Sequence, residues 1–247
     1  MSKVAVITGA SKGIGATTAT AFSREGYDVV VNYRNDTGAA DKVVADIHKN
    51  GGKAVAIQAD VYSDLGSRKL FDFVANEFGG VDVLVNNAGF APEPPFGEWT
   101  QANITESMTC MFVSAALCTQ AVVPLMKAGG SILFTSSVNG LLFGGNPGVP
   151  FYSASKAAVI NFAQTMAEKL APNNIRCNVV APGTTKTPFW DTRDPNRAQK
   201  NIDMTIQKEW VEPDEVANAF VFLAKTLHIN AQTIVVDGGW QKKLRNV

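Results

Sequence analysis

The sequence contains little cysteine and histidine, with three cysteines and two histidines among 247 residues. No CxxC, HxxxH or HExxH spacing occurs, so the sequence offers no ligand set for a structural zinc ion or a metalloprotease site. An odd, sparse set of cysteines fits a reducing compartment, where disulfides are rare. Cys110 and Cys118 fall in a helical stretch and are interpreted as small buried apolar residues rather than nucleophiles.

The chain also has no charge excess, since 22 Lys and Arg balance 22 Asp and Glu. A neutral chain lacks the basic field that non-specific nucleic-acid binding requires. Apolar runs such as 29–31 and 132–134 are far shorter than the roughly 20 residues that span a bilayer. A signal peptide would show a basic region, a long apolar stretch and a small-residue cleavage site, and the first residues do not have this pattern. We therefore expect a cytoplasmic protein with no nucleic-acid partner and no membrane partner.

Short β-branched runs alternate with helical patterns along almost the whole chain. The runs predicted to be strands are Val4–Thr8, Asp28–Tyr33, Ala54–Ala59, Val81–Asn86, Ser131–Ser136, Ile175–Ala181 and Thr233–Val236. The segments predicted to be helices are Ile14–Glu25, Ala39–Asn50, Leu65–Phe78, Thr100–Ala128, Tyr152–Ala171 and Pro213–Thr226. Several strands lack polar alternation, which is typical of strands buried on both faces. The alternation predicts an α/β fold, a doubly wound, three-layer, seven-stranded parallel sheet with helices on both faces.

No repeat, charge block or Ser/Gly linker divides the chain, so residues 1–247 are expected to form one domain. Two stretches, Phe90–Glu98 and Gly183–Trp210, interrupt the alternation after predicted strand ends. Ligands of open α/β sheets bind beyond the carboxyl ends of the strands. We therefore expect these stretches, and the region 183–210 above all, to form the substrate side of a site. The alternative is that they are plain surface loops.

A glycine-rich turn, Thr8-Gly9-Ala10-Ser11-Lys12-Gly13-Ile14-Gly15, joins the first predicted strand to the first predicted helix. Glycine lets the backbone turn tightly and approach a pyrophosphate, and a helix N-terminus offers free N–H groups to an anion. Three glycines alone are a weak signal, because such a turn can be only a turn. The strand before it, the helix after it and a second strand beyond make dinucleotide binding a fair hypothesis.

The tip of the second predicted strand, Val31-Asn32-Tyr33-Arg34, carries no acidic residue. An acidic residue there would accept the ribose 2′-hydroxyl of NAD, whereas a cation accommodates the 2′-phosphate of NADP. Arg34 and Lys12 are two cations placed to pair with that phosphate. This pattern predicts NADP(H) as the cofactor, with two solvated surface cations as the alternative.

Tyr152 and Lys156 lie four residues apart in a predicted helix and so share one face. An ammonium beside a phenol favours the phenolate and lowers the tyrosine pKa, which makes a general acid/base. Alone the pair is a poor signal, since chance supplies a Tyr-x-x-x-Lys in such a chain about one time in four. Ser136 and Ser137, at the end of the preceding strand, strengthen it, because a hydroxyl there could hold a substrate oxygen.

Together these segments resemble the short-chain dehydrogenase/reductase family over essentially the whole chain, which implies a Rossmann-like fold. The motifs that carry the resemblance are Thr8–Gly15, Asp60-Val61, Asn86-Asn87-Ala88-Gly89, Ser137 with Tyr152 and Lys156, Pro182-Gly183 with Thr187, and the ending Thr233–Gly239. The residues predicted to bind the cofactor are Gly9, Ser11, Lys12, Gly13, Ile14, Gly15, Arg34, Asp60, Val61, Asn87, Ala88, Gly89, Tyr152, Lys156, Pro182, Gly183 and Thr187. Ser137, Tyr152 and Lys156 fall on the family's catalytic serine, tyrosine and lysine.

One position departs from the family's pattern. Aligned on Phe112–Ala121, the family's relay asparagine, which holds a water that passes protons to the lysine, is replaced by Met111. A thioether barely accepts a hydrogen bond and cannot donate one. Asn103 and Thr109 are nearby polar residues, but helical spacing puts neither at that position. Either another group supplies the water or turnover is impaired.

The resemblance implies an NADPH-dependent carbonyl reductase or alcohol dehydrogenase, in which Tyr152 protonates the carbonyl oxygen, Ser137 stabilises that oxygen and Lys156 assists the tyrosine. The competing hypothesis is a dinucleotide-binding sensor with impaired chemistry, and Met111 is the feature that favours it. Family members are commonly homotetramers or homodimers, which implies an interface through the helices 100–128 and 152–171 and the last strand. The sequence does not identify the substrate. An apolar pocket is suggested by Phe90, Phe96, Trp99, Phe143, Phe151, Phe189 and Trp190. The alternative is that these aromatic residues are core or subunit contacts.

Overall fold

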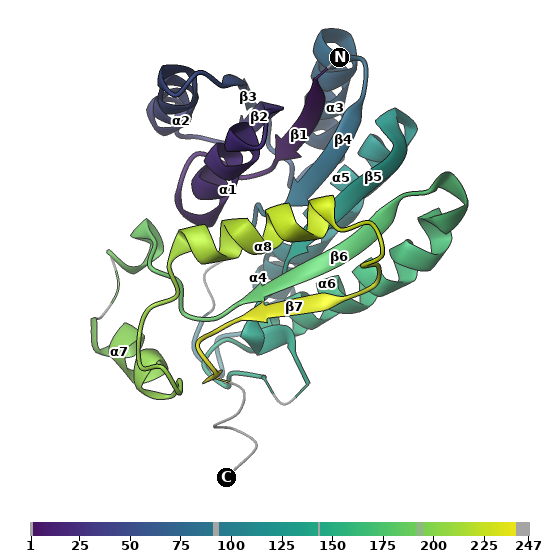
Figure 1. Ribbon diagram of the computed structural model, residues 1–247. Helices are drawn as coiled ribbons and strands as arrows, with labels where there is room; N and C mark the ends of the chain where they lie inside the picture. The colour runs from purple at the N-terminus through teal and green to yellow at the C-terminus, as the bar shows by residue number, and fades with distance from the viewer. Residues whose placement is uncertain (1, 91–93, 143, 192, 194, 241–247) are drawn as a thin grey trace.

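The computed structural model describes residues 2–90, 94–142, 144–191, 193 and 195–240. Seven parallel strands form one sheet in the order β3-β2-β1-β4-β5-β6-β7 (Figure 1). They are β1 (Lys3–Ile7), β2 (Tyr27–Tyr33), β3 (Lys53–Gln58), β4 (Val81–Asn86), β5 (Met126–Thr135), β6 (Arg176–Pro182) and β7 (Thr233–Val236). Each predicted strand is confirmed, with ends shifted by a few residues. The strand order reverses between β1 and β4, which makes the sheet doubly wound as predicted.

Helices cover both faces of the sheet in a three-layer arrangement (Figure 1). One face carries α1 (Gly13–Arg24), α2 (Thr37–Lys49) and α8 (Pro213–Lys225). The other carries α3 (Asp64–Phe78), α5 (Ser114–Val122) and α6 (Pro150–Leu170). Two further helices, α4 (Gln101–Met108) and α7 (Pro195–Asp203), lie beyond the ends of the strands. The expected helix-covered parallel sheet is therefore confirmed.

Alternate strand residues supply the two apolar layers. In β1, Val4 and Val6 belong to the cluster packed under α3, α5 and α6, while Ala5 and Ile7 belong to the cluster packed under α1, α2 and α8. All four side chains are at most 3% exposed. Full burial of a valine or isoleucine stabilises the fold by about 1.5–3 kcal/mol relative to exposure. This explains why the strand reads as a continuous apolar run rather than an alternating one.

The long helix after β4 differs from the sequence expectation. The predicted helix 100–128 is the helical stretch Gln101–Leu125, which includes a π-helical turn at Thr109–Val113. β5 begins directly after it, at Met126. By length and composition alone this stretch is apolar enough to cross a membrane, which inspection of short apolar runs missed. Cys118 and Val122, in its second half, are buried in the core cluster, so α5 packs against the sheet, whereas most residues of α4 are exposed.

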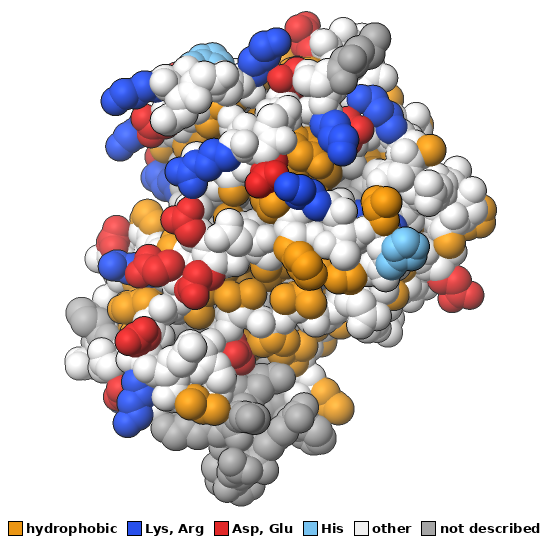
Figure 2. All heavy atoms as spheres, in the orientation of Figure 1, with side chains coloured by type: hydrophobic (Ala, Val, Ile, Leu, Met, Phe, Trp, Pro, Cys, Tyr) orange, Lys and Arg blue, Asp and Glu red, His pale blue; other side chains and the backbone are white. Residues whose placement is uncertain are grey.

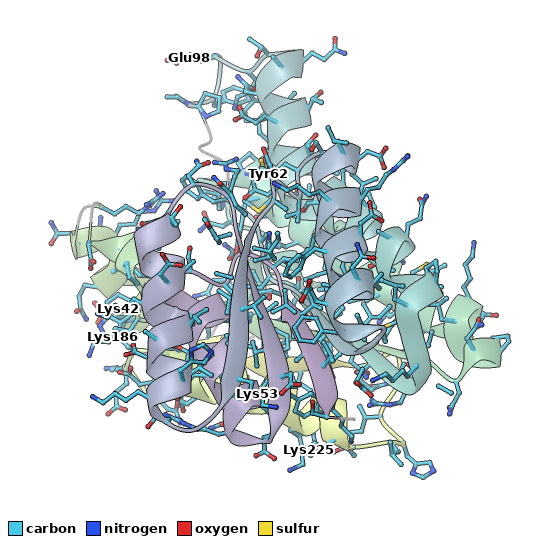
Figure 3. The ribbon with its side chains drawn as sticks, turned by 90° about the horizontal axis from the view of Figure 1, so that it is seen from above. Lys42, Lys53, Tyr62, Glu98, Lys186 and Lys225 are labelled. Carbon is cyan, nitrogen blue, oxygen red and sulfur yellow. The ribbon has the colours of Figure 1, made fainter. Side chains whose placement is uncertain are left out.

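The connections after β4, β5 and β6 meet at the carboxyl edge of the sheet, which places their residues around one space. Figure 3 shows Tyr62 beyond this end of β3, while Lys53, the first residue of that strand, lies at the opposite end. The region 183–210 is not purely a loop, because it contains α7. The edge of the sheet thus gathers the segments in which the sequence predicted a site.

Candidate active site

The glycine turn after β1 has the close packing that its sequence predicts. Gly9 has a φ of 62° and Gly13 a φ of 54°, a region that other residues rarely adopt. A Cβ on Gly9 would lie 2.8 Å from the Cα of Ala88, and a Cβ on Gly15 would lie 2.4 Å from the carbonyl oxygen of Gly9. These positions therefore require glycine. The turn and the end of β4 are pressed together as a result.

The N-terminus of α1 faces this turn without a capping side chain among the described residues. By contrast, Asp36 caps α2 and Ser63 caps α3 through hydrogen bonds to backbone N–H groups. The first turn of α1 also carries no acidic residue. The open N–H groups and the positive end of the helix dipole make this turn able to bind an anion.

A cavity of about 850 Å³ opens at the carboxyl edge of the sheet. The predicted cofactor-binding and catalytic residues that line it are Gly9, Lys12, Gly13, Ile14, Gly15, Arg34, Asp60, Val61, Asn87, Ala88, Gly89, Ser137, Tyr152, Lys156, Pro182, Gly183 and Thr187. Ser11 belongs to the same turn but is not among the described residues that line the cavity. Segments far apart in the sequence thus converge on one space, as the motif order predicts.

The two predicted phosphate-binding cations have different surroundings. The guanidinium of Arg34 lies over the ring of Tyr62, 4.8 Å from its centroid. The ammonium of Lys12 forms an ion pair with Asp36, and this hydrogen bond lowers the pKa of the Asp36 carboxyl. Sequence reasoning noted Asp36 as the nearest acid but missed that it pairs with Lys12. Arg34 is therefore the cation at this end of the cavity that has no carboxylate partner among the described residues.

Asn87 joins the ends of three strands beneath the cavity. Its amide donates hydrogen bonds to the carbonyl oxygens of Thr8 and Gly9, at 3.1 and 3.2 Å. Its side-chain oxygen accepts a hydrogen bond from the hydroxyl of Thr135 at 3.3 Å. The hydroxyl of Thr8 in turn accepts from the backbone N–H groups of Asn87 and Ala88, both at 3.0 Å. This network holds β1, β4 and β5 in fixed relation where the strand order reverses.

Tyr152 and Lys156 project from α6 into the cavity, as their spacing predicts. The ammonium of Lys156 lies 5.7 Å from the ring centroid of Tyr152 and donates a 2.8 Å hydrogen bond to the carbonyl oxygen of Thr135. The side chains of Tyr152 and Ser137 are hydrogen-bonded to each other. Ser136 instead donates to the carbonyl oxygen of Lys156 at 2.8 Å, which ties α6 to the end of β5. Of the two serines, Ser137 is therefore the one bonded to the tyrosine.

Burial controls the protonation of this group. It lowers the pKa of Lys156 to about 8 and raises the pKa of Tyr152, which the hydrogen bond with Ser137 opposes. The predicted lowering of the Tyr152 pKa is therefore wrong in its net direction, because the penalty that burial places on the phenolate is the largest cause. The ammonium of Lys156 lies over the ring and bonds to the carbonyl oxygen of Thr135. At neutral pH the tyrosine is a neutral acid and the lysine a cation.

Met111 lies in the π-helical turn, is 3% exposed and lines the cavity. Its sulfur would be 3.0 Å from a Cβ on Gly89, so the thioether lies against the end of β4. Asn103 is occupied elsewhere, because its side chain forms a capping box with Thr100 at the start of α4. The thioether of Met111 therefore faces the cavity, and Asn103 does not.

The predicted aromatic pocket is only partly formed. Phe90, Phe189 and Trp190 line the cavity. Trp99 instead packs against Phe96 and Phe151 in a separate group, and none of these three is among the described lining residues. Phe143 lies outside the described residues.

The expected substrate region 183–210 does line the cavity, but the sequence singled out neither Arg193, Arg197 and Asn201 within it nor Trp240 beyond it. Arg197 and Asn201 belong to α7, whose nine mostly polar residues carry too few apolar positions to predict a helix. Pro195 at its first position was the available signal, since proline favours the first helical residue.

Within the described residues, no group of three or more His, Cys, Asp or Glu side chains could hold a metal ion. The three cysteines are buried and free, and burial raises the pKa of Cys118 to about 12. Their interpretation as apolar residues agrees with this geometry. The chemistry of the cavity thus comes from hydroxyl, phenol, ammonium and guanidinium groups.

Comparisons with known proteins agree with this geometry. A family model described as enoyl-(acyl carrier protein) reductase matches residues 9–241. The chain is 40% identical to a 3-oxoacyl-(acyl-carrier-protein) reductase of Synechocystis sp., over 96% of both chains. It is 36% identical to glucose 1-dehydrogenase 2 of Bacillus subtilis, over 96% of this chain and 94% of the relative.

A crystal structure of a short chain dehydrogenase from Burkholderia cenocepacia in complex with NADP superposes with a TM-score of 0.90. The two chains are 33% identical, and the match covers 97% of this chain and 98% of the other. The family model, the relatives and the fold lead to one conclusion: this chain belongs to the short-chain dehydrogenase/reductase family and is an oxidoreductase of the kind that binds a nicotinamide dinucleotide.

Proposed function

We propose that this enzyme interconverts a carbonyl and an alcohol by hydride transfer with NADP(H), using Ser137, Tyr152 and Lys156. The observation that carries the proposal is that these three side chains line the same cavity as the glycine turn and Arg34. The reductase and dehydrogenase names of the relatives support it. We assign a small-molecule substrate to the side of the cavity formed by the region 183–210, and a cytoplasmic location to the protein.

The residues present fit a phosphorylated dinucleotide. The uncapped first turn of α1 suits its diphosphate, and the guanidinium of Arg34 suits its 2′-phosphate. Asp60 and Val61 line the cavity next to Tyr62, over whose ring Arg34 lies, and would contact the adenine. When bound, the dinucleotide supplies or accepts the hydride. The role of the protein is to orient it and to manage the proton.

The protein moves the proton through Tyr152. As a neutral acid it donates its phenolic proton to the carbonyl oxygen during reduction. Ser137 holds the same oxygen by a hydrogen bond and stabilises the developing negative charge. The cationic Lys156 lies over the ring and offsets part of the penalty that burial places on the phenolate that remains. Alcohol oxidation runs through the same contacts in reverse.

The sensor hypothesis is not favoured, because the relatives are named as oxidoreductases and the three predicted catalytic side chains line one cavity. Met111 is the one feature that weakens the case for efficient turnover. It bears on the supply of protons to Lys156, not on the binding of the dinucleotide.

Cofactor preference follows from Arg34. NADPH should bind more tightly than NADH, and Arg34→Ala should weaken NADPH by about 1.5–3 kcal/mol, the value of a hydrogen bond to a charged group. The affinity for NADH should stay nearly unchanged. Fluorescence titration of both cofactors measures this. Equal affinities in the unmodified protein would contradict the assignment.

Asp36→Asn is the matched variant for Lys12. Asparagine retains the cap of α2 but removes the carboxylate that pairs with Lys12, so NADPH should bind more tightly and NADH should not. A loss of NADPH affinity in this variant would show that Lys12 does not contribute to the phosphate site.

Carbonyl reduction should depend on pH through Lys156. Its pKa of about 8 means that the ammonium is present below that pH and lost above it, while Tyr152 keeps its proton because its pKa is raised. The kcat/KM for reduction should therefore be flat near neutrality and fall above pH 8, as an initial-rate profile would record.

Lys156→Arg is the control, because a guanidinium stays charged throughout this range. If it is active, its profile should lack the fall near pH 8. A wild-type profile that stays flat through that region would show that Lys156 does not lose its charge there. That result would overturn the assigned role.

Met111→Asn tests whether proton supply is limiting. If it is, the amide should raise kcat on the order of 10-fold, since general acid/base effects reach about 10²–10⁴-fold. The Kd for NADPH should hardly change. Tyr152→Phe serves as the inactive control, and thermal unfolding separates loss of fold from loss of chemistry. An unchanged kcat in a folded Met111→Asn protein would mean that Met111 is only a packing residue.

We also propose that the chain forms a homodimer or homotetramer through the helical stretch Gln101–Leu125, α6 and β7. Hydrophobic side chains gather over α8 and β7 on the face shown in Figure 2. Phe222, Leu227 and Val235 are 50%, 65% and 38% exposed there. As an edge strand, β7 also offers unpaired backbone groups to a second copy.

Light scattering at micromolar concentration should give a mass two or four times the 26.3 kDa of one chain. Val235→Lys should shift the protein toward the monomer, because a charge at an edge strand opposes pairing. Leu65→Lys, at an exposed position of α3, should have no such effect. A monomeric unmodified protein would contradict the proposal.

A further inference from the structure

The charged side chains that line the cavity are mainly cationic. Among its described lining residues, Asp60 is the one acid, and the cations are Lys12, Arg34, Lys156, Arg193 and Arg197. The first three already have roles at the cofactor and the catalytic group. Arg193, just before α7, and Arg197, within it, have no such role, although they add two positive charges to the same cavity.

Arg193 packs against two aromatic rings. Its guanidinium lies 3.6 Å from the ring centroid of Phe189 and 5.3 Å from that of Phe90. One of its N–H groups also donates a 2.9 Å hydrogen bond to the carbonyl oxygen of Phe189. A guanidinium has five N–H donors. The contact therefore orients the group and uses only part of its hydrogen-bonding capacity.

Neither arginine has a carboxylate partner in the part of the chain that the structure describes. Arg193 is partly buried, and the pKa of its guanidinium is lowered by that burial and by the nearby charge of Arg197. Two like charges on one cavity wall without a counter-charge repel each other. An anion placed between them and the cavity would remove this cost and pair with both.

We propose that Arg193 and Arg197 form a subsite for an anionic group of the substrate, a carboxylate or a phosphate. The substrate is then a carbonyl compound that carries an acid group, with the aromatic faces of Phe90 and Phe189 beside its carbon chain. This inference rests on the proposed reductase function. The dinucleotide diphosphate is the other source of the same chemistry, but the uncapped N-terminus of α1 already provides for it.

The test compares straight-chain oxo acids of increasing length with their methyl esters, which differ only in the charge. For the acid whose length fits, kcat/KM should exceed that of its ester by about 10-fold or more, the effect of one charge-assisted contact. Arg197→Ala, at an exposed position, and Arg193→Met, which keeps bulk over Phe189, should each abolish this preference through KM. The ester rates and the KM for NADPH should stay the same.

Lys200→Ala is the matched control, because Lys200 is an exposed cation on α7 outside the lining residues. It should retain the acid preference. If the arginine variants raise the KM for NADPH and leave the acid-to-ester ratio unchanged, the pair serves the cofactor diphosphate and the inference is wrong. An unmodified protein that reduces esters and acids equally well would also overturn it.

Calorimetric titration of the oxo acids into the NADP⁺-saturated protein separates this inference from the proposed function, since no hydride is available to transfer. Arginine-dependent binding of the acids without any turnover would refute the reductase assignment and retain the anion subsite. Turnover of neutral carbonyls with NADPH, without binding of the acids, would retain the reductase assignment and refute the anion subsite.

Discussion

The side chain of Asn87 connects the ends of three strands, because it donates to the carbonyl oxygens of Thr8 and Gly9 and accepts from Thr135. These contacts lie where the strand order reverses, between β1 and β4, and this reversal leaves a crevice at the carboxyl edge. The glycine turn can approach β4 only because Gly9 has no Cβ to meet Ala88. The position of Lys156 in the proposed catalytic group depends on the same junction, since its ammonium donates to the carbonyl oxygen of Thr135.

Charge divides the cavity into functional parts. Arg34 and the open end of α1 make one end suited to phosphate groups, and Arg193 with Arg197 make another part suited to an acid. Lys156 lies in the wall with Tyr152, where burial lowers the lysine pKa and raises the tyrosine pKa. The result is a neutral acid beside a cation at neutral pH. That combination suits proton donation to a carbonyl oxygen that gains negative charge.

Much of the fold could be predicted from the sequence because its signals are local. The apolar strands show burial on both faces, and Gly9, Gly13 and Gly15 show a turn against a neighbouring strand. The π-helical turn at Thr109–Val113 could not be predicted, because the register shift of about 100° that an inserted residue causes is hidden in a stretch as apolar as Gln101–Leu125. The Lys12–Asp36 ion pair was missed, although both residues were considered, because pairing depends on how the turn meets α2. The direction of the Tyr152 pKa depends on burial, which spacing along a helix does not reveal.

In the proposed mechanism, Tyr152 protonates a carbonyl oxygen while hydride is delivered at the same cavity. The most direct measurement follows deuterium from stereospecifically labelled NADPH into the alcohol by mass spectrometry, across a panel of carbonyl compounds. We expect one deuterium on the carbinol carbon in the unmodified protein and almost no labelled alcohol with Tyr152→Phe, whose NADPH binding is retained. Label transfer of equal rate in Tyr152→Phe, or NADPH oxidation without label in the alcohol, would contradict it.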